Sequence, residues 1–293
     1  MLVKLYRKYV STSSREKIRR TFFGKFLMSI RNFAATCMST FVYVFYKFLP
    51  HSEKNQLYAF MGKHGLKFYP YPYSLKYKKI PVQILWDDQQ ELPYVMHTGK
   101  KLYYPPHTKK IDKGYRFLLM EQDISSPHRY LENLNRLKGK TILDIGASEG
   151  IFSLDVIEII DHAYLFECEE RWIRALNATF APWKDKVTII KKYVSDVDDE
   201  NNITIDKFFE EKNKTNLFLK MDIEGYEQAA LKGAEKIFQE IKDIDFSICT
   251  YHKEEDAAQI AQFFRKHSIE TEYTKGLMYF EHDFRKVLIR RKY

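Results

Sequence analysis

Two acidic, glycine-containing turns hold most of the chemistry that this sequence offers. Residues 143–150 read Leu-Asp-Ile-Gly-Ala-Ser-Glu-Gly and residues 220–225 read Lys-Met-Asp-Ile-Glu-Gly, and each turn follows an apolar strand and precedes a predicted helix. In open α/β sheets, strand ends of this kind form the ligand crevice. The first turn lacks the full G-x-G-x-x-G pattern of dinucleotide enzymes and carries Asp144 and Glu149 instead. Carboxylates repel a pyrophosphate but attract a ligand that bears a sulfonium and an ammonium group, so the turn favours S-adenosylmethionine over NAD.

The predicted crevice continues along the ends of the next strands. Gly146 and Gly150 allow a tight turn and a close approach to a ligand, and the helix start that follows can hold a carboxylate such as the methionine tail. Glu167 ends the second strand, 23 residues after Asp144, where an acid commonly accepts hydrogen bonds from ribose hydroxyls. Residues 195–196, Ser-Asp, close the third strand at the level expected for the adenine. The residues expected to contact the donor are Asp144, Gly146, Ser148, Glu149, Gly150, Glu167, Cys168, Ser195, Asp196 and Asp222.

The elements that must position these residues alternate regularly after Lys140. Helices are expected over 170–180, 224–239 and 254–266, each with one apolar stripe, and Tyr226 lies on the stripe of the second. This alternation predicts an α/β fold with a mostly parallel, seven-stranded, Rossmann-like sheet covered on both faces. The last two strands have a short connection and should pair antiparallel at one edge. The strands are expected over 141–145, 162–168, 187–194, 217–222, 246–251, 270–274 and 287–291.

The segment before this sheet, residues 51–135, is rich in aromatic residues and prolines. It predicts a small irregular or β-containing subdomain, with strand-like runs over 82–86 and 115–120 and no helix of useful length before Pro127. Its aromatic rings are of a kind that more often packs onto a core than stacks on sugars or bases. Residues 121–130 crowd polar and ionisable groups just ahead of the first core strand, so we expect them to cap the crevice.

The net charge of +9 is concentrated at the N-terminus, because residues 1–50 contain ten Lys or Arg and only Glu16 as an acid. The remaining 243 residues balance 38 basic against 38 acidic side chains, which argues against a basic groove for nucleic acid. Apolar residues recur with helical periodicity over 23–48, but the uncharged run between Arg31 and Lys47 is shorter than the ~20 residues that span a bilayer. No cleavage site of small residues follows it, as a signal peptide would need.

Two interpretations of this basic amphipathic arm stay open. The helix either covers the protein's own catalytic domain or a second subunit, or lies in a membrane interface with its basic residues toward anionic headgroups. The three cysteines are few, odd in number and widely spaced, which favours a reducing compartment, so we expect a cytoplasmic protein with possible peripheral contact at the inner membrane face. At 293 residues the chain allows one large domain with an appendage, and we divide it into 1–50, 51–135 and a donor-binding domain over 136–293.

Three motifs resemble the FkbM-type methyltransferase family over about residues 120–293. They are the turn at 144–150, Phe-Glu at 166–167, and Lys-Met-Asp-Ile-Glu-Gly-Tyr-Glu at 220–227 with Leu-Lys-Gly-Ala at 231–234. The stretch 247–253, Ser-Ile-Cys-Thr-Tyr-His-Lys, is similar to a further motif of some members. The resemblance implies a class I methyltransferase fold, S-adenosylmethionine as donor, and O-methylation of a hydroxyl on a sugar, a glycan or another small natural product. The chain departs from the commoner first motif by carrying Ser148 where Asn is usual.

Methyl transfer to a hydroxyl requires alignment and a base, because the hydroxyl loses its proton as the bond forms. His252 is the first candidate and His128 the second. Lys220 and Asp222 are two positions apart on one sheet face and are expected to pair, with Lys220 orienting the carboxylate or the acceptor. A divalent metal on Asp222, Glu224 and another acid is the alternative, as in some related sugar O-methyltransferases. Methylation of nucleic acid or protein, and donor binding without turnover, are the competing functions, and the oligomeric state stays open.

Overall fold

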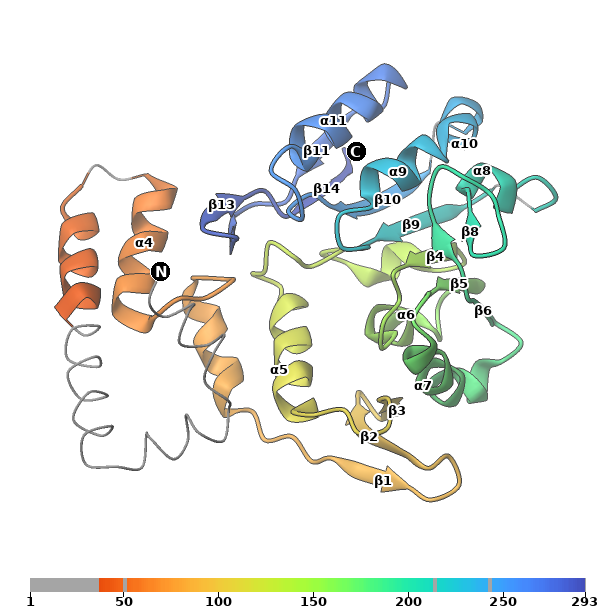
Figure 1. Cartoon of the computed structure of the whole chain (residues 1–293), viewed down its shortest axis with the longest axis horizontal. Coiled ribbons are helices and arrows are strands. Elements are labelled where there is room, and N and C mark those ends of the chain that lie inside the picture. Colours follow the sequence, from red (N-terminus) through yellow and green to blue (C-terminus); the bar gives the residue numbers. More distant parts are fainter. Residues whose placement is uncertain (1–36, 50–51, 213–214, 242–243, 293) are drawn as a thin grey trace, which may run out of the picture. The chain divides into compact units, whose positions relative to one another are not determined.

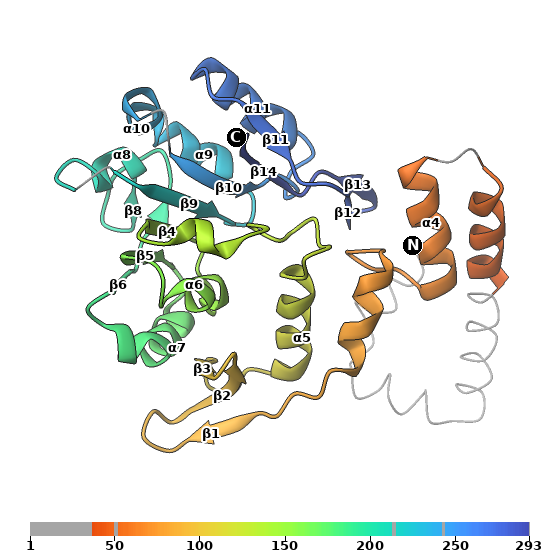
Figure 2. The same ribbon diagram turned by 180° about the vertical axis from the view of Figure 1, so that it is seen from behind.

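The computed structural model describes residues 37–49, 52–212, 215–241 and 244–292, and the chain divides into two compact units, Met1–Tyr71 and Pro72–Tyr293. In the smaller unit, residues 37–47 form a helix that lies beside α4 (Glu53–His64), as Figures 1 and 2 show. The helix predicted over 23–48 is therefore confirmed for 37–47, and residues 23–36 lie outside the described part. The three-part division of the chain stays a prediction.

Gly62 of α4 allows the two helices of the smaller unit to approach closely. A Cβ at this position would lie 2.5 Å from the backbone nitrogen of Tyr43, nearer than any side chain tolerates. Next to this contact the rings of Tyr46 and Tyr58 stack with their centroids 4.7 Å apart. One face of helix 37–47 is thus occupied by α4, and the other apolar residues of this helix lie elsewhere on its surface.

The larger unit is built around a seven-stranded sheet with the strand order β11-β14-β10-β9-β4-β5-β6. The pairs from β10 to β6 are parallel, while β14 pairs antiparallel with both β10 and β11, so the predicted mostly parallel sheet with an antiparallel edge is confirmed. In chain order the strands are β4 (Thr141–Ile145), β5 (His162–Phe166), β6 (Val187–Ile190), β9 (Leu217–Met221), β10 (Asp245–Cys249), β11 (Thr271–Tyr273) and β14 (Leu288–Arg291).

Helices cover both faces of this sheet, as expected for a doubly wound fold (Figures 1 and 2). All five residues of β9 and all five of β10 are buried, because parallel central strands are packed on both sides. The core includes Phe246 and Phe264, whose rings stack at 4.1 Å. One face carries α6 (Ile151–Val156) and α7 (Glu170–Phe180), and the other carries α8 (Ile205–Phe208), α9 (Glu227–Lys232), α10 (Glu235–Glu240) and α11 (Asp256–Lys266).

The segment ahead of the sheet contains both strands and helices. Strands β1 (Leu85–Asp87), β2 (Leu92–His97) and β3 (Lys100–Tyr103) form a small antiparallel sheet, so this segment contains the expected β-structure. The strand predicted over 115–120 is wrong, since α5 spans Ile111–Glu121. The helical periodicity of α5 is visible only when the segment is taken from residue 111, because Ile111 and Tyr115 form the buried side of the helix. The expectation of no useful helix before Pro127 is also wrong, because α4 and α5 both precede it.

Three further boundaries differ from the predictions. The strand predicted over 187–194 splits, because β7 (Tyr193–Val194) pairs with β8 (Asn202–Ile203) outside the main sheet. The helix predicted over 224–239 breaks into α9 and α10 at Gly233, and Tyr226, expected on its buried stripe, is 65% exposed. The connection before β14 contains a hairpin, β12 (Met278–Phe280) with β13 (Asp283–Arg285). Short 3₁₀ turns span Pro72–Lys79 (η1), Leu134–Leu137 (η2) and Ala181–Trp183 (η3).

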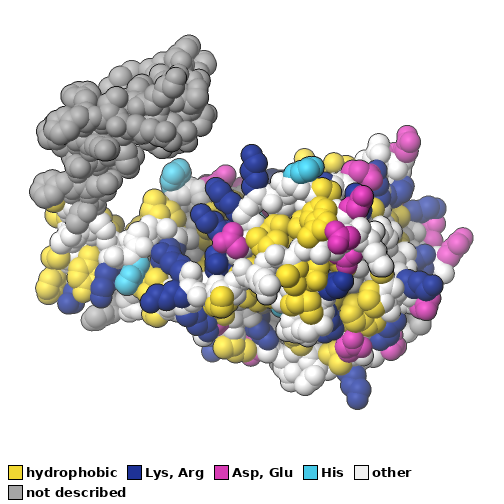
Figure 3. Space-filling model, turned by 90° about the horizontal axis from the view of Figure 1, so that it is seen from below, with side chains coloured by type: hydrophobic (Ala, Val, Ile, Leu, Met, Phe, Trp, Pro, Cys, Tyr) yellow, Lys and Arg dark blue, Asp and Glu magenta, His cyan; other side chains and the backbone are white. Residues whose placement is uncertain are grey.

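On the face of the larger unit that Figure 3 shows, acidic and basic side chains are interspersed around a patch of hydrophobic ones. The basic and acidic side chains of residues 51–293 are thus balanced in number and also mixed in position on this face.

Candidate active site at the strand ends

The turn after β4 rests directly on the end of β9. Gly146, Ser148 and Gly150 all have positive φ angles, of 80°, 49° and 79°. A Cβ at Gly146 would lie 1.9 Å from the carbonyl oxygen of Asp222, so no other residue fits there without moving one of the two strands. The glycine turn and the Asp222 segment are therefore one rigid piece of backbone, as the predicted crevice requires.

Glu167 lies at the end of the neighbouring strand β5 and holds the turn in place. Its side chain is buried, and its two carboxylate oxygens accept hydrogen bonds from the backbone nitrogens of Ser148 and Glu169, both at 2.8 Å. Each carboxylate oxygen can accept a second hydrogen bond. Glu167 therefore keeps the acceptor capacity that two ribose hydroxyls need, and the residues present here fit S-adenosylmethionine.

Lys220 pairs with Asp144 and not, as predicted, with Asp222. In the register of β4 and β9, Asp144 lies opposite Lys220, and the Lys220 Nζ is 2.9 Å from Asp144 Oδ1 and 2.6 Å from the carbonyl oxygen of Gly146. Ser153 donates a hydrogen bond of 2.6 Å to the other Asp144 oxygen. Burial lowers the pKa of Lys220, but the Asp144 and Asp222 carboxylates outweigh it and raise that pKa. Asp144 and Lys220 thus form a buried ion pair that braces the glycine turn.

Glu149 carries less negative charge than the sequence predicts. Its carboxyl is buried, and burial raises its pKa to about 7. With Asp144 paired to Lys220, the region around the donor turn is therefore only weakly acidic at neutral pH. The turn therefore attracts a cationic donor less strongly than a count of its carboxylates indicates.

Asp222 is the centre of a polar cluster at the end of β9. Tyr130 donates a hydrogen bond of 2.9 Å to Asp222 Oδ2, and the hydroxyl of Tyr251 lies 3.4 Å from Oδ1. The Nε2 atoms of His128 and His252 lie 3.5 Å from Oδ2 and Oδ1 respectively. Burial raises the pKa of Asp222, but the hydrogen bond and charge of His128, with the charges of Lys220 and His252, lower it far below its ordinary value. Asp222 is therefore ionised throughout the neutral range.

His252 is fixed by a second carboxylate, Glu227. The His252 Nδ1 lies 2.9 Å from Glu227 Oε1, which also accepts a hydrogen bond of 3.0 Å from the backbone nitrogen of Ile223. Because an ionised carboxylate only accepts, Nδ1 carries the proton, and the lone pair of neutral His252 is on Nε2. Within the described residues Nε2 is buried and has no hydrogen-bond partner. It lies 3.7 Å from Glu224 Oε2, whose side chain is 89% exposed, and so is close to the surface.

The proton affinity of His252 is shifted upward by its surroundings. Burial lowers its pKa, but Glu227, Asp222 and Glu224 together raise it above the usual value. A carboxylate-oriented imidazole with a free nitrogen beside an aspartate is the arrangement of a general base.

His128 is more enclosed than His252. Its ring is buried between Tyr130 and Tyr251, with centroid distances of 5.2 and 5.7 Å, and its Nε2 lies 3.8 Å from Cys249 Sγ. Burial lowers its pKa, but Glu121 and Asp222 raise it overall. The segment 121–130, expected to cap the crevice, thus supplies His128 and Tyr130 to the Asp222 cluster.

Comparison with known proteins agrees with these strand-end motifs. The model of the methyltransferase FkbM domain matches residues 33–271, which is most of the chain. The chain belongs to the FkbM methyltransferase family. Among solved structures, the methyltransferase FkbM from Methylobacillus flagellatus KT is 16% identical with a TM-score of 0.42, over 75% of this chain and 58% of that protein. No curated protein matches the chain.

Two other solved structures are similar to this FkbM-family chain. The METTL16 methyltransferase domain is 11% identical with a TM-score of 0.42, and the match covers 80% of this chain and 95% of that one. TrmK of M. capricolum, solved in complex with S-adenosylhomocysteine, is 12% identical with a TM-score of 0.36, over 54% and 65% of the two chains. The family membership implies S-adenosylmethionine as the methyl donor. The mostly parallel seven-stranded sheet is the fold that the resemblance to this family predicts.

Three further residues were predicted to contact the donor, namely Ser195, Asp196 and Cys168. Ser195 and Asp196 do not close the third strand of the sheet, because β6 ends at Ile190 and both residues follow β7. Asp196 forms an ion pair of 2.6 Å with Lys232, and the Ser195 hydroxyl contacts Val197 and Asn202. Cys168 follows β5 and is half-buried, and burial raises the pKa of its thiol.

Two groups of side chains within the described residues have donor atoms close enough to hold a metal ion. They are His128, Asp222 and Cys249, and Asp222, Glu227 and His252, each with all donor atoms within 4.8 Å of one another. Glu224, which the metal alternative names as a ligand, belongs to neither group. In the second group, Glu227 Oε1 and His252 Nδ1 already bond to each other.

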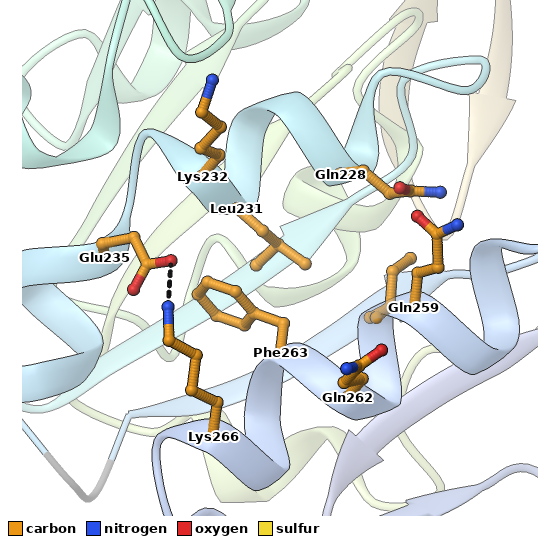
Figure 4. A pocket seen from close by; sticks show the side chains of 9 residues that line it. Gln228, Leu231, Lys232, Glu235, Gln259, Gln262, Phe263 and Lys266 are labelled. Atoms are coloured by element: carbon orange, nitrogen blue, oxygen red, sulfur yellow. Dashed lines mark hydrogen bonds and ion pairs between the residues drawn. The ribbon is translucent and has the colours of Figure 1, made fainter.

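A pocket of about 350 Å³ lies between α9 and α11. Leu231 and Phe263 face each other across it, and Glu235 and Lys266 form an ion pair of 3.2 Å at one end (Figure 4). None of the candidate site residues lines this pocket, so it is separate from the polar cluster.

The sequence did not single out Glu227, Tyr130 or Tyr251 for chemistry. Glu227 is the last acid of the family motif at 220–227, and its signal is an acid on the apolar side of a helix. Its buried carboxylate needs partners. Tyr130 lies within the polar segment 121–130, and Tyr251 directly precedes His252. The sequence shows both positions, but it does not show that the two hydroxyls point toward Asp222.

Proposed function

We propose that this chain transfers a methyl group from S-adenosylmethionine to a hydroxyl of a small-molecule or glycan acceptor. The observation that carries the proposal is the Glu227–His252 pair, whose unpartnered Nε2 lies beside Asp222. The turn that rests on Asp222 is the one whose shape suits the donor. A base and a donor turn at adjacent strand ends are the two parts that O-methylation needs.

Each residue has a separate task in this mechanism. The bound donor supplies an electrophilic methyl group. His252 Nε2 accepts the proton of the acceptor hydroxyl, and Glu227 stabilises the resulting imidazolium through Nδ1. Asp222, held by Tyr130, orients the hydroxyl toward the donor, and Lys220 with Asp144 keeps the donor turn in position. The proton then passes from His252 to solvent near the exposed Glu224.

Aromatic side chains around His252 support a sugar-like acceptor. Phe280 packs edge-on against Tyr251 and His252, with centroids 5.3 and 6.2 Å away. Tyr226 is exposed and lies 5.9 Å from the ammonium of Lys253. Aromatic faces of this kind pack against the C–H face of a sugar ring while neighbouring polar groups bind its hydroxyls.

We propose that the reaction takes place in the cytoplasm, where the three cysteines stay reduced. Two other functions must be distinguished from O-methylation by experiment: donor binding without turnover, and methylation of nucleic acid or protein. Calorimetry should show binding of S-adenosylhomocysteine and no binding of NADH. Labelled donor should then transfer its methyl group to hydroxyls in a screen of sugars and glycans.

His252→Ala should lower kcat by about 10²-fold to 10⁴-fold and leave the affinity for S-adenosylhomocysteine unchanged. Labelling of RNA or protein in place of glycans would overturn the acceptor class, and a lack of heat with S-adenosylhomocysteine would overturn the donor. Activity should survive chelation. Loss on chelation that Mg²⁺ or Mn²⁺ restores would make Asp222, Glu227 and His252 metal ligands instead.

A further inference from the structure

Helix 37–47 presents a row of large apolar side chains to solvent. The row consists of Met38, Phe41, Val44, Phe45 and Phe48, which are between 45% and 80% exposed. Phe41 and Phe45 stack with centroids 5.8 Å apart, so the row is a continuous surface. At 3.6 residues per turn the four positions within the helix fall on one side of it, and Phe48 follows directly after its end. A contiguous exposed apolar patch of this kind marks an interaction site.

The opposite side of the same helix is fixed to α4. Ser39 donates a hydrogen bond to the carbonyl oxygen of Gly62, and Tyr46 stacks on Tyr58. On an α-helix the α4-facing residues and the apolar row lie about 150° apart. The row therefore cannot turn inward against α4, and it faces away from the contact that holds the helix.

The charge of the N-terminal sequence indicates the chemistry of the partner. Residues 17–52 contain no acidic side chain, and residues 1–50 contain ten Lys or Arg with Glu16 as the one acid. A second copy of this chain would carry the same positively charged N-terminal sequence and be repelled. Anionic lipid headgroups attract it. Within the described residues, moreover, no helix is long and apolar enough to cross a membrane.

We infer that the apolar row lies on the surface of an anionic lipid membrane, with helix 37–47 parallel to the bilayer. The rings of Phe41, Phe45 and Phe48 enter the boundary between headgroups and acyl chains, and the basic N-terminal sequence adds electrostatic attraction. This places the protein at a membrane surface whatever its acceptor is, because the inference uses no residue of the proposed active site.

The test is flotation of the full chain with vesicles of phosphatidylcholine alone and of phosphatidylcholine with phosphatidylglycerol. The chain should partition onto the anionic vesicles at least about tenfold more strongly, and added salt should weaken this binding. The triple variant Phe41→Gln/Phe45→Gln/Phe48→Gln should lose about tenfold or more of it. Gln is chosen because it keeps the helix propensity of the segment.

The matched control is Ile84→Gln/Trp86→Gln/Met96→Gln, which removes three comparably exposed apolar side chains from the larger unit. It should float like the unaltered chain, and both variants should keep the affinity for S-adenosylhomocysteine and the far-ultraviolet circular dichroism. Phe48→Gln, just beyond the helix, should give a smaller loss and covers the case in which the triple variant does not fold.

Three results would overturn the inference. The first is equal binding to neutral and anionic vesicles, and the second is equal loss in the control variant. The third is a dimer in light scattering that the triple variant converts to a monomer, since the row is then a contact between copies of this chain.

Discussion

At the scale of single residues, Glu227 shows how a buried charge can serve a reaction. Its side chain is fully buried, and its carboxylate is stabilised by the backbone nitrogen of Ile223 and by Nδ1 of His252. An ionised carboxylate in such a place is costly unless it is hydrogen-bonded. Glu227 also fixes the tautomer of His252, so its burial keeps the reactive nitrogen on the side of Asp222.

Glu227→Gln should move the acidic limb of the kcat profile to lower pH. The base acts in its neutral form, so activity rises as pH passes the raised pKa of His252. Removing the carboxylate removes the largest attraction that favours the imidazolium, so that pKa falls and the limb shifts downward. The plateau should also fall about tenfold or more, since the tautomer is no longer fixed.

The measurement is kcat over the neutral range for the unaltered chain, Glu227→Gln and Glu224→Gln. Glu224 is exposed and screened by solvent, so its variant is the matched control and should shift the limb much less. A limb that stays in place in Glu227→Gln would show that His252 is not the titrating base.

At the scale of elements, the pairing of β4 with β9 brings the glycine turn and the Asp222 cluster together. Lys220→Met leaves Asp144 buried without its cation, and the free energy of unfolding should fall by about 3–5 kcal/mol. Lys220→Met/Asp144→Asn removes both charges and should recover part of the loss. Urea unfolding followed by circular dichroism measures both, and an unchanged midpoint in Lys220→Met would contradict a structural role for the pair.

The glycine turn gives a second prediction at this scale. Gly146→Ala should abolish binding of S-adenosylhomocysteine and destabilise the fold, because the new Cβ meets the Asp222 carbonyl and φ is 80°. The same change at Gly114, in α5 with open space around it, should stabilise the chain by about 0.5–1 kcal/mol. Calorimetry and thermal unfolding compare the two, and equal effects would show that the turn tolerates a side chain.

The elements that follow from short-range pattern were predictable from the sequence. The strand over 141–145 and the helix over 170–180 agree with β4 and α7 because each has a full period of apolar residues between clear breaks. The strand predicted over 115–120 failed because six apolar-rich residues show no period by themselves. The prediction for Tyr226 failed for a different reason, since α9 begins only at Glu227 and Tyr226 is its exposed N-cap residue.

At the scale of the whole molecule, the sequence predicts which ionisable residues gather but not how they pair. The strand order brings Lys220 opposite Asp144, and β9 next to β10 brings Asp222 and His252 together. These pairings depend on the order and register of the strands, so the spacing of residues in the sequence could not predict them. The burial of a side chain is equally hidden in the sequence. Glu149 is an example, because burial raises its pKa to about 7 where the sequence predicts a full negative charge.

In the proposed mechanism, the contact of Gly146 with the main chain of Asp222 holds the donor turn next to the Asp222 cluster. That contact joins backbone atoms of two adjacent strand ends, whereas the aromatic rings beside Asp222 and His252 come from segments 121–130 and 251–285. The sequence of those segments can therefore change during evolution toward a new acceptor, while the backbone contact that holds the donor turn stays the same.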